Sequence, residues 1–198
     1  MAQFPVEPFN TLSNILFLLV ALYWVIRLKK VQDPAFKSFL KINLPLLFVG
    51  YVGGTIYHAT RSHLAWMLMD VVPIYIIGFL TALFHWKLIK TPPLKVAGIF
   101  LICFLVPFLL IQYVLPFTPN TPTLGYMCLA FPVVLPIIID QIKTRGVLIK
   151  SFLIPLILLS VALFFRAADS SQWVSMKLPM GTHWIWHVLG ATTCHFLL

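Results

Sequence analysis

The chain has 198 residues, of which 61% are hydrophobic and only 10% are charged. Soluble domains carry about a quarter charged residues, so this composition excludes an ordinary soluble domain and indicates a membrane protein. The net charge of +9 does not indicate nucleic-acid binding, because the basic residues lie between apolar segments and form no stripe with base-stacking aromatics. The three scattered cysteines, Cys103, Cys128 and Cys194, predict neither a disulfide framework nor a cysteine zinc site.

Apolar segments follow one another along the whole sequence. A membrane-spanning helix needs about 20 mostly apolar residues. Segments of this kind lie at 10–28, 38–60, 64–86, 95–115, 122–141, 147–166 and 181–198. Short connections are expected at Pro92-Pro93 and over 116–122 and 167–172. The expected fold class is therefore all-α: one domain over residues 1–198, built as an integral, multi-pass bundle of seven transmembrane helices.

The basic residues predict how this bundle is oriented. Eleven of the 14 Lys and Arg residues fall in or beside the first, third and fifth connections. The opposite side has only Arg61, Arg166 and Lys177. Because cytoplasmic loops carry the excess of basic residues, we expect the N-terminus outside and the C-terminus in the cytoplasm.

Four ionisable residues from separate segments are expected at one depth near the outer face. His58 ends the second helix, Asp70 lies near the start of the third, and His183 and His187 occupy the first turns of the seventh. At 1.5 Å per residue, these side chains can lie within about 10 Å of one depth. Ionisable groups inside a bilayer are costly and usually mark function, so this group is the candidate site.

The spacing of the histidines predicts a metal site. His183 and His187 are four residues apart, so both imidazoles project from one helix face. With His58 they make a three-histidine set that leaves a fourth tetrahedral position open for water, the pattern of catalytic zinc. Zn²⁺ is thus the expected cofactor; it lowers the pKa of bound water to about 7, and Asp70 would orient or deprotonate that water or hold a histidine. Such a site within a lipid-accessible bundle suits hydrolysis of a lipid ester or amide.

Ordinary structural roles remain open for each of these residues. The two histidines of the seventh helix can belong to an interfacial aromatic belt with Trp184 and Trp186. His58 can hydrogen-bond a backbone carbonyl, and Asp70 can cap the third helix. The meeting of all four at one depth favours the metal site.

The start of the first helix carries a run of polar residues, Glu7, Asn10, Ser13 and Asn14. Asn10 shares a helix face with both Ser13 and Asn14, so these groups can hydrogen-bond the metal-binding histidines and orient their rings. Alternatively, Asn10 caps the helix, and Ser13 and Asn14 make hydrogen bonds between helices.

Other conspicuous residues are expected to be structural. Gly53 and Gly54 permit close helix packing near His58. His195 lies deeper in the seventh helix, where we expect a buried hydrogen-bonding residue rather than a ligand. Asp169 is expected in an outer loop, away from the site.

Taken in order, these motifs resemble those of the alkaline ceramidases. That family belongs to a superfamily of seven-span zinc hydrolases that includes the progestin/adiponectin receptors and the Per1-like lipid-remodelling proteins. The resemblance covers essentially the whole chain and rests on Glu7-x-x-Asn10-x-x-Ser13-Asn14, His58, Asp70-x-x-Pro73 and His183-x-x-Trp186-His187. It implies zinc on His58, His183 and His187, with Asp70 near the zinc-bound water. The implied partner is a membrane lipid, a ceramide-like amide cleaved to a fatty acid and a sphingoid base.

The chain departs from the family pattern beside the second-helix histidine. The family has a serine one turn earlier, where this sequence has Gly54, and we expect the neighbouring Thr55 to act as the catalytic hydroxyl instead. The stretch from His183 to His187 together with His195 also resembles the Per1-like branch, which acts on lipid esters. The functions expected are therefore an amide hydrolase first, then an ester hydrolase or a non-catalytic lipid-sensing receptor with a structural zinc site. Neither nucleic acid nor an obligatory protein partner is expected, and a small transporter is disfavoured because no inverted repeat is present.

Overall fold

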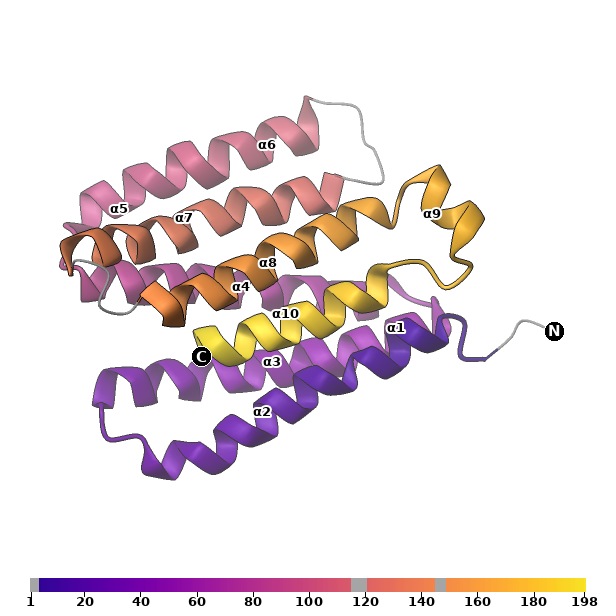
Figure 1. Ribbon diagram of the computed structural model, residues 1–198, viewed down its shortest axis with the longest axis horizontal. Helices are drawn as coiled ribbons and strands as arrows, with labels where there is room; N and C mark the ends of the chain where they lie inside the picture. Colours follow the sequence, from indigo (N-terminus) through magenta and orange to yellow (C-terminus); the bar gives the residue numbers. More distant parts are fainter. Residues whose placement is uncertain (1–3, 115–120, 145–148) are drawn as a thin grey trace. The chain divides into compact units, whose positions relative to one another are not determined.

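The computed structural model in Figure 1 describes residues 4–114, 121–144 and 149–198, and these are helical without a strand. The elements are α1 (Pro8–Ser13), α2 (Ile15–Arg27), η1 (Leu28–Lys30), α3 (Pro34–Thr60), α4 (Leu64–Leu88), α5 (Pro93–Phe100), η2 (Leu101–Leu105), α6 (Val106–Tyr113), α7 (Thr121–Lys143), α8 (Ile149–Ala168), α9 (Gln172–Lys177) and α10 (His183–Leu197). They form two compact units, one of residues 1–77 with 158–198 and one of residues 78–157. The expectation of a single domain stays a prediction.

Local sequence signals set the ends of α3 in the first unit. Asp33 caps its start, where the side chain accepts a hydrogen bond of 2.7 Å from Phe36 N, and Pro34 occupies the first turn. Arg61 ends the helix in the left-handed region with φ of 48°, and its N–H bonds Tyr57 O at 2.7 Å. This cap holds His58 in the last full turn of α3.

The first unit brings the start and the end of the chain together. The α1–α2 pair packs against α3, and α10 packs against both α1 and α2, so α10 runs alongside the first helix in Figure 1. Gly53 lies where α3 meets α4: a Cβ there would be 2.6 Å from Met69 C and 2.8 Å from Asp70 N. The close packing predicted for Gly53 is therefore confirmed.

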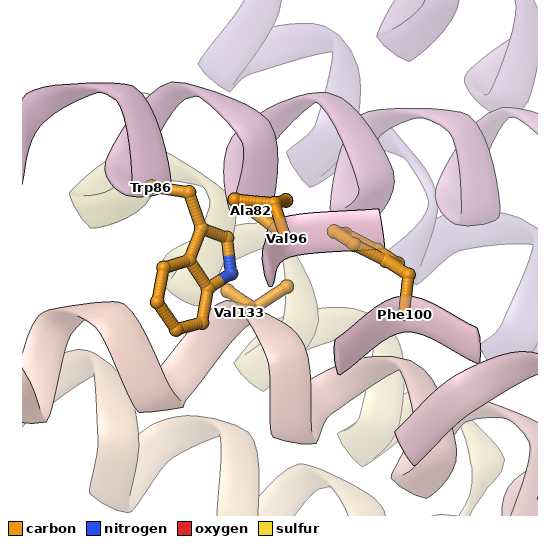
Figure 2. Close-up of a cluster of buried hydrophobic side chains, with 5 residues drawn as sticks. All are labelled: Ala82, Trp86, Val96, Phe100 and Val133. Atoms are coloured by element: carbon orange, nitrogen blue, oxygen red, sulfur yellow. The ribbon is translucent and has the colours of Figure 1, made fainter. Parts of the chain in front are cut away.

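The second unit is built around a small apolar core. Ala82 and Trp86 of α4 pack with Val96 and Phe100 of α5 and Val133 of α7, as Figure 2 shows. The Trp86 indole N–H donates a hydrogen bond of 3.0 Å to the carbonyl oxygen of Pro132. In a regular helix this oxygen would accept from the backbone N–H four residues later, but residue 136 is a proline and has no N–H. Trp86 thus satisfies a backbone carbonyl of α7 that Pro136 leaves without its helical hydrogen bond.

Within the described part of the chain, five helices are long and apolar enough to cross a membrane, namely Pro8–Lys30, Pro34–Thr60, Leu64–Leu88, Pro93–Tyr113 and Thr123–Lys143. A further apolar helix, Phe152–Ala168, is shorter. Large apolar side chains on these helices are exposed, Ile26 by 72% and Ile102 by 70%, which is typical of surfaces that meet lipid. A multi-pass membrane protein accounts for these features. At 15 residues, α10 extends about 22 Å, less than the thickness of a bilayer core of about 30 Å.

Candidate metal centre

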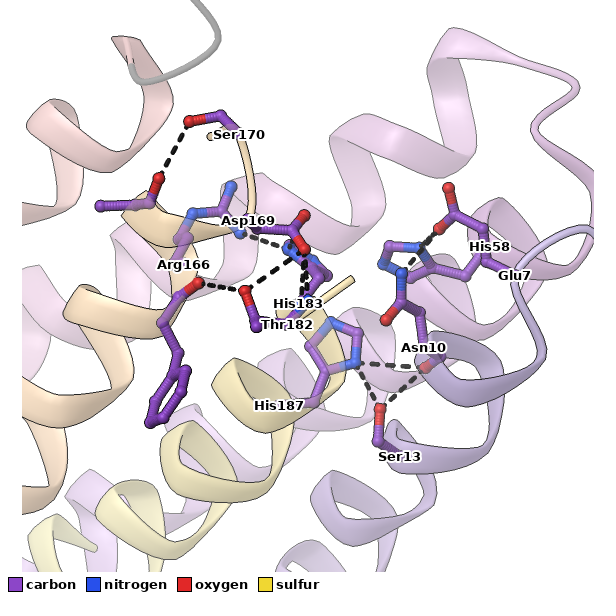
Figure 3. A network of polar contacts seen from close by, with 12 residues as sticks. Glu7, Asn10, Ser13, His58, Arg166, Asp169, Ser170, Thr182, His183 and His187 are labelled. Carbon is purple, nitrogen blue, oxygen red and sulfur yellow. Dashed lines mark hydrogen bonds and ion pairs between the residues drawn. The ribbon is translucent and has the colours of Figure 1, made fainter. Parts of the chain in front are cut away.

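Three histidines converge in the first unit. His58 comes from the end of α3, and His183 and His187 come from the first two turns of α10. One ring nitrogen from each lies within 4.8 Å of the others, and the ring centroids are 4.7 to 5.2 Å apart. His58 and His187 are each only 2% exposed. The predicted meeting of these three residues is confirmed, and Figure 3 shows them between α1, α3 and α10.

The neighbours of His58 fix which ring nitrogen is available. Its Nδ1 lies 2.6 Å from Glu7 Oε2, and because a carboxylate only accepts, Nδ1 carries the proton. The lone pair is therefore on Nε2. That atom is buried without a hydrogen-bond partner among the described residues, and it lies 3.8 Å from Asp70 Oδ2. A buried nitrogen with a free lone pair is an arrangement suited to a metal ligand.

The neighbours of His187 lead to the same assignment. Its Nδ1 lies 3.1 Å from Asn10 O and 2.8 Å from Ser13 Oγ. A carbonyl oxygen can only accept, so Nδ1–H is the donor and Nε2 holds the lone pair. The Ser13 hydroxyl donates to the same Asn10 oxygen at 3.1 Å, which leaves its own oxygen to accept from the ring. The first helix thus orients the ring of His187, which is one of the two roles that the sequence left open for these residues.

Glu7 links the first helix to the end of α3. Its Oε2 accepts from His58 Nδ1 and from Asn10 Nδ2, and its Oε1 accepts from the Arg61 guanidinium, with a 2.6 Å bond to Nε. Partial burial acts to raise the pKa of Glu7, but hydrogen bonds, that from His58 first, and the charge of Arg61 outweigh it and lower the pKa to about 2. A carboxylate that stays ionised keeps the proton of His58 on Nδ1.

His183 is held through the backbone at the start of α10. Asp169 Oδ1 accepts from Thr182 N at 2.6 Å and from His183 N at 3.0 Å, so it binds two N–H groups that the helix cannot satisfy itself. Gly181 adopts φ of 66°, and a Cβ there would collide with the same carboxylate. Asp169 therefore caps α10 at the site. The expectation that it lies away from the site is wrong, because α9 folds the chain back between the two.

Arg166 also belongs to the surroundings of the site, and the sequence reading missed it. Its Nη1 lies 3.5 Å from His183 Nδ1, and its guanidinium lies 5.2 Å from the centre of the Trp186 ring. The sequence does carry a signal for Arg166, because it is a single arginine at the end of an apolar segment, on the predicted outer side where basic residues are few.

Asp70 and Thr55 occupy different positions relative to the histidines. Asp70 lies in the second turn of α4 and faces His58 Nε2. The hydroxyl of Thr55 is buried and makes no hydrogen bond with the described residues, and none of the contacts given above for the three histidines involves it. Its catalytic role stays a prediction. His195, two turns further along α10, packs against the rings of Tyr23 and Trp24 at 4.8 and 5.9 Å and is not part of the cluster.

We expect Asp169→Ala to lower both stability and metal affinity. The loss of a helix cap costs about 0.5–2 kcal/mol, and the freed start of α10 would misplace His183 and weaken metal binding about tenfold. Asp33→Ala is the matched control, because Asp33 caps α3 by the same kind of bond away from the histidines. Thermal unfolding and metal titration of both variants test this. Equal metal affinity in the two variants would show that the cap does not support the site.

The donors fit a divalent metal ion. The imidazoles of His58 and His187 each have an unprotonated Nε2, because Nδ1 donates its proton to Glu7 in one case and to Asn10 O in the other. The Nε2 of His58 is also buried and has no hydrogen-bond partner in the described part of the chain. Comparison with family models, with curated proteins and with solved structures finds no significant match. The site therefore stands on its geometry alone: three close histidines, two of them buried and His183 partly buried, that could hold a metal ion.

Proposed function

We propose that this protein is a zinc-dependent intramembrane hydrolase of lipid amides, of the kind the resemblance to alkaline ceramidases implies. The observation that carries the proposal is the buried histidine cluster with Asp70 beside the free Nε2 of His58. Three neutral imidazoles with an open fourth position are the ligand set of catalytic zinc. A bound zinc ion would supply a polarised carbonyl and a water molecule acidified toward neutral pH.

The side chains around the cluster have separate tasks in this reaction. Asp70 accepts a proton from the attacking water and passes it to the leaving amine. The water oxygen bonds to the carbonyl carbon, the carbon–nitrogen bond breaks, and a fatty acid and an amine remain. Glu7, Asn10 and Ser13 keep the imidazoles of His58 and His187 in one tautomer and orientation.

A membrane lipid is the substrate class that suits the surroundings. The helices of the first unit expose large apolar side chains, among them Phe9 and Leu12, which directly precede Asn10 and Ser13 in the sequence. We propose a seven-span arrangement in which α8 and α10 add to the five long helices, since a short span is accommodated by local thinning of the bilayer. The excess of Lys and Arg at the opposite ends of the helices supports a position of the histidines near the outer face.

The test is a paired measurement on protein purified in detergent. We expect close to one zinc ion per chain, and release of fatty acid from ceramide faster than from phospholipid. Release from phospholipid alone would favour the lipid-ester reaction of the lipid-remodelling branch. Zinc without any fatty-acid release would favour a lipid-sensing receptor, and protein without zinc would contradict the proposal.

A further inference from the structure

A buried amide lies beside the histidine cluster without a partner. Asn14 sits between α1 and α2, where the helix continues with φ of −60° and ψ of −24°. The residue is 1% exposed, and its Nδ2 makes no hydrogen bond with the described residues. Buried amide groups are nearly always hydrogen-bonded, so a donor left over in this place indicates a missing acceptor.

Gly54 shows where this amide points. A Cβ on Gly54 would lie 2.6 Å from Asn14 Nδ2 and would collide with Asp70 Oδ1. The Asn14 amide and the Asp70 carboxylate of α4 therefore meet at the same point on α3. Gly54 is one turn before His58, so this point lies on the face of α3 that carries the metal histidine. The absence of a side chain there leaves room for both polar groups.

The orientation of the amide follows from the neighbouring carboxylate. With Nδ2 toward Asp70, the amide presents donors to an acceptor, whereas the flipped amide would set two oxygens against each other. The point in front of Gly54 is thus flanked by a donor on one side and an acceptor on the other. A water molecule can bond both groups at this point, whereas a carbonyl oxygen can accept from the amide donor alone.

We propose that Asn14 Nδ2 donates a hydrogen bond to the acyl carbonyl oxygen of the lipid substrate and stabilises the charge that this oxygen gains during attack. This inference rests on the proposed function and places the Asn14 donor beside Gly54, the position where the family has a serine. Thr55 is not needed for it. A serine cannot simply be restored at Gly54, because its Cβ would displace the amide and press on Asp70.

Binding of lauroyl hydroxamic acid to the zinc-loaded protein tests this inference without any turnover. The probe has an acyl chain and a carbonyl oxygen, and hydroxamates chelate a bound metal. We expect Asn14→Leu to keep one zinc per chain and to weaken the hydroxamate about tenfold, the effect of one hydrogen bond to a charged group. Calorimetric titration measures the affinity, and metal analysis measures the zinc.

Asn43→Leu is the matched control. Asn43 is a fully buried asparagine of the same unit, and its Nδ2 is already bonded to Phe39 O at 2.8 Å. Its replacement should leave hydroxamate affinity within about twofold of the wild type, as expected for a residue that shares no contact with the site. Should Asn14→Leu fail to fold, Asn14→Ala supplies the same test, because alanine removes the amide donor without adding a larger side chain.

A double-mutant cycle separates direct contact from an effect through Asp70. In the Asp70→Asn background, Asn14→Leu should still weaken the hydroxamate about tenfold if the amide touches the ligand. Disappearance of the effect in that background would overturn the proposal, as would unchanged affinity in Asn14→Leu or loss of its zinc. A wild-type protein without zinc overturns the proposed function and this inference together, whereas the other outcomes overturn the inference alone.

Discussion

Replacing His187 with alanine should remove the bound metal and abolish turnover. His187 supplies one of the three nitrogens, and its Nδ1 is held by Asn10 and Ser13. The loss of one of three ligands to a catalytic zinc leaves two imidazoles and should lower affinity by at least about 100-fold, more than the 10–100-fold typical of supporting residues. Metal content after dialysis and fatty-acid release from ceramide measure the two effects.

His195→Ala is the control for this substitution. His195 lies two turns further along α10 and contacts aromatic rings rather than the cluster. The variant should keep its zinc and its activity. If His187→Ala retained both stoichiometric zinc and turnover, the histidine cluster would not be the active centre.

Replacing Asp70 with asparagine should stop the chemistry while leaving the metal in place. The amide has the shape of the carboxylate but cannot accept a proton from water, and general-base catalysis contributes about 10²–10⁴-fold to a rate. We therefore expect kcat to fall within that range with one zinc per chain retained. Single-turnover assays with ceramide, combined with metal analysis, measure this.

Asp140→Asn is the matched control, since Asp140 lies in the second unit and has no contact with the three histidines among those described. Loss of zinc from Asp70→Asn would show that Asp70 supports the metal site rather than the proton transfer. Unchanged kcat would leave Asp70 without a catalytic role.

Much of the site was predictable because its residues stand at helix ends. Apolar segments of the right length gave the approximate positions of the helices, and antiparallel neighbours bring the end of one helix beside the start of the next. His58 ends α3 and His183 begins α10, so their meeting follows from the order of the segments. The four-residue spacing of His183 and His187 fixed their common face.

The remaining features depend on backbone conformations that periodicity does not reveal. Asp169 reaches the start of α10 because α9 and the left-handed Gly181 turn the chain back, whereas the sequence predicts a simple connection there. The role of Gly54 depends on what surrounds it in space, namely Asn14 and Asp70 from two other helices. Such contacts depend on tertiary packing, which no single segment encodes.

The division of the first unit between the two ends of the chain has a consequence for biosynthesis. Ser13 and His187 meet across 174 positions, and the whole second unit is made between them. Contacts this distant in sequence form late. All three histidines are therefore available to a metal ion only after α10 has been synthesised.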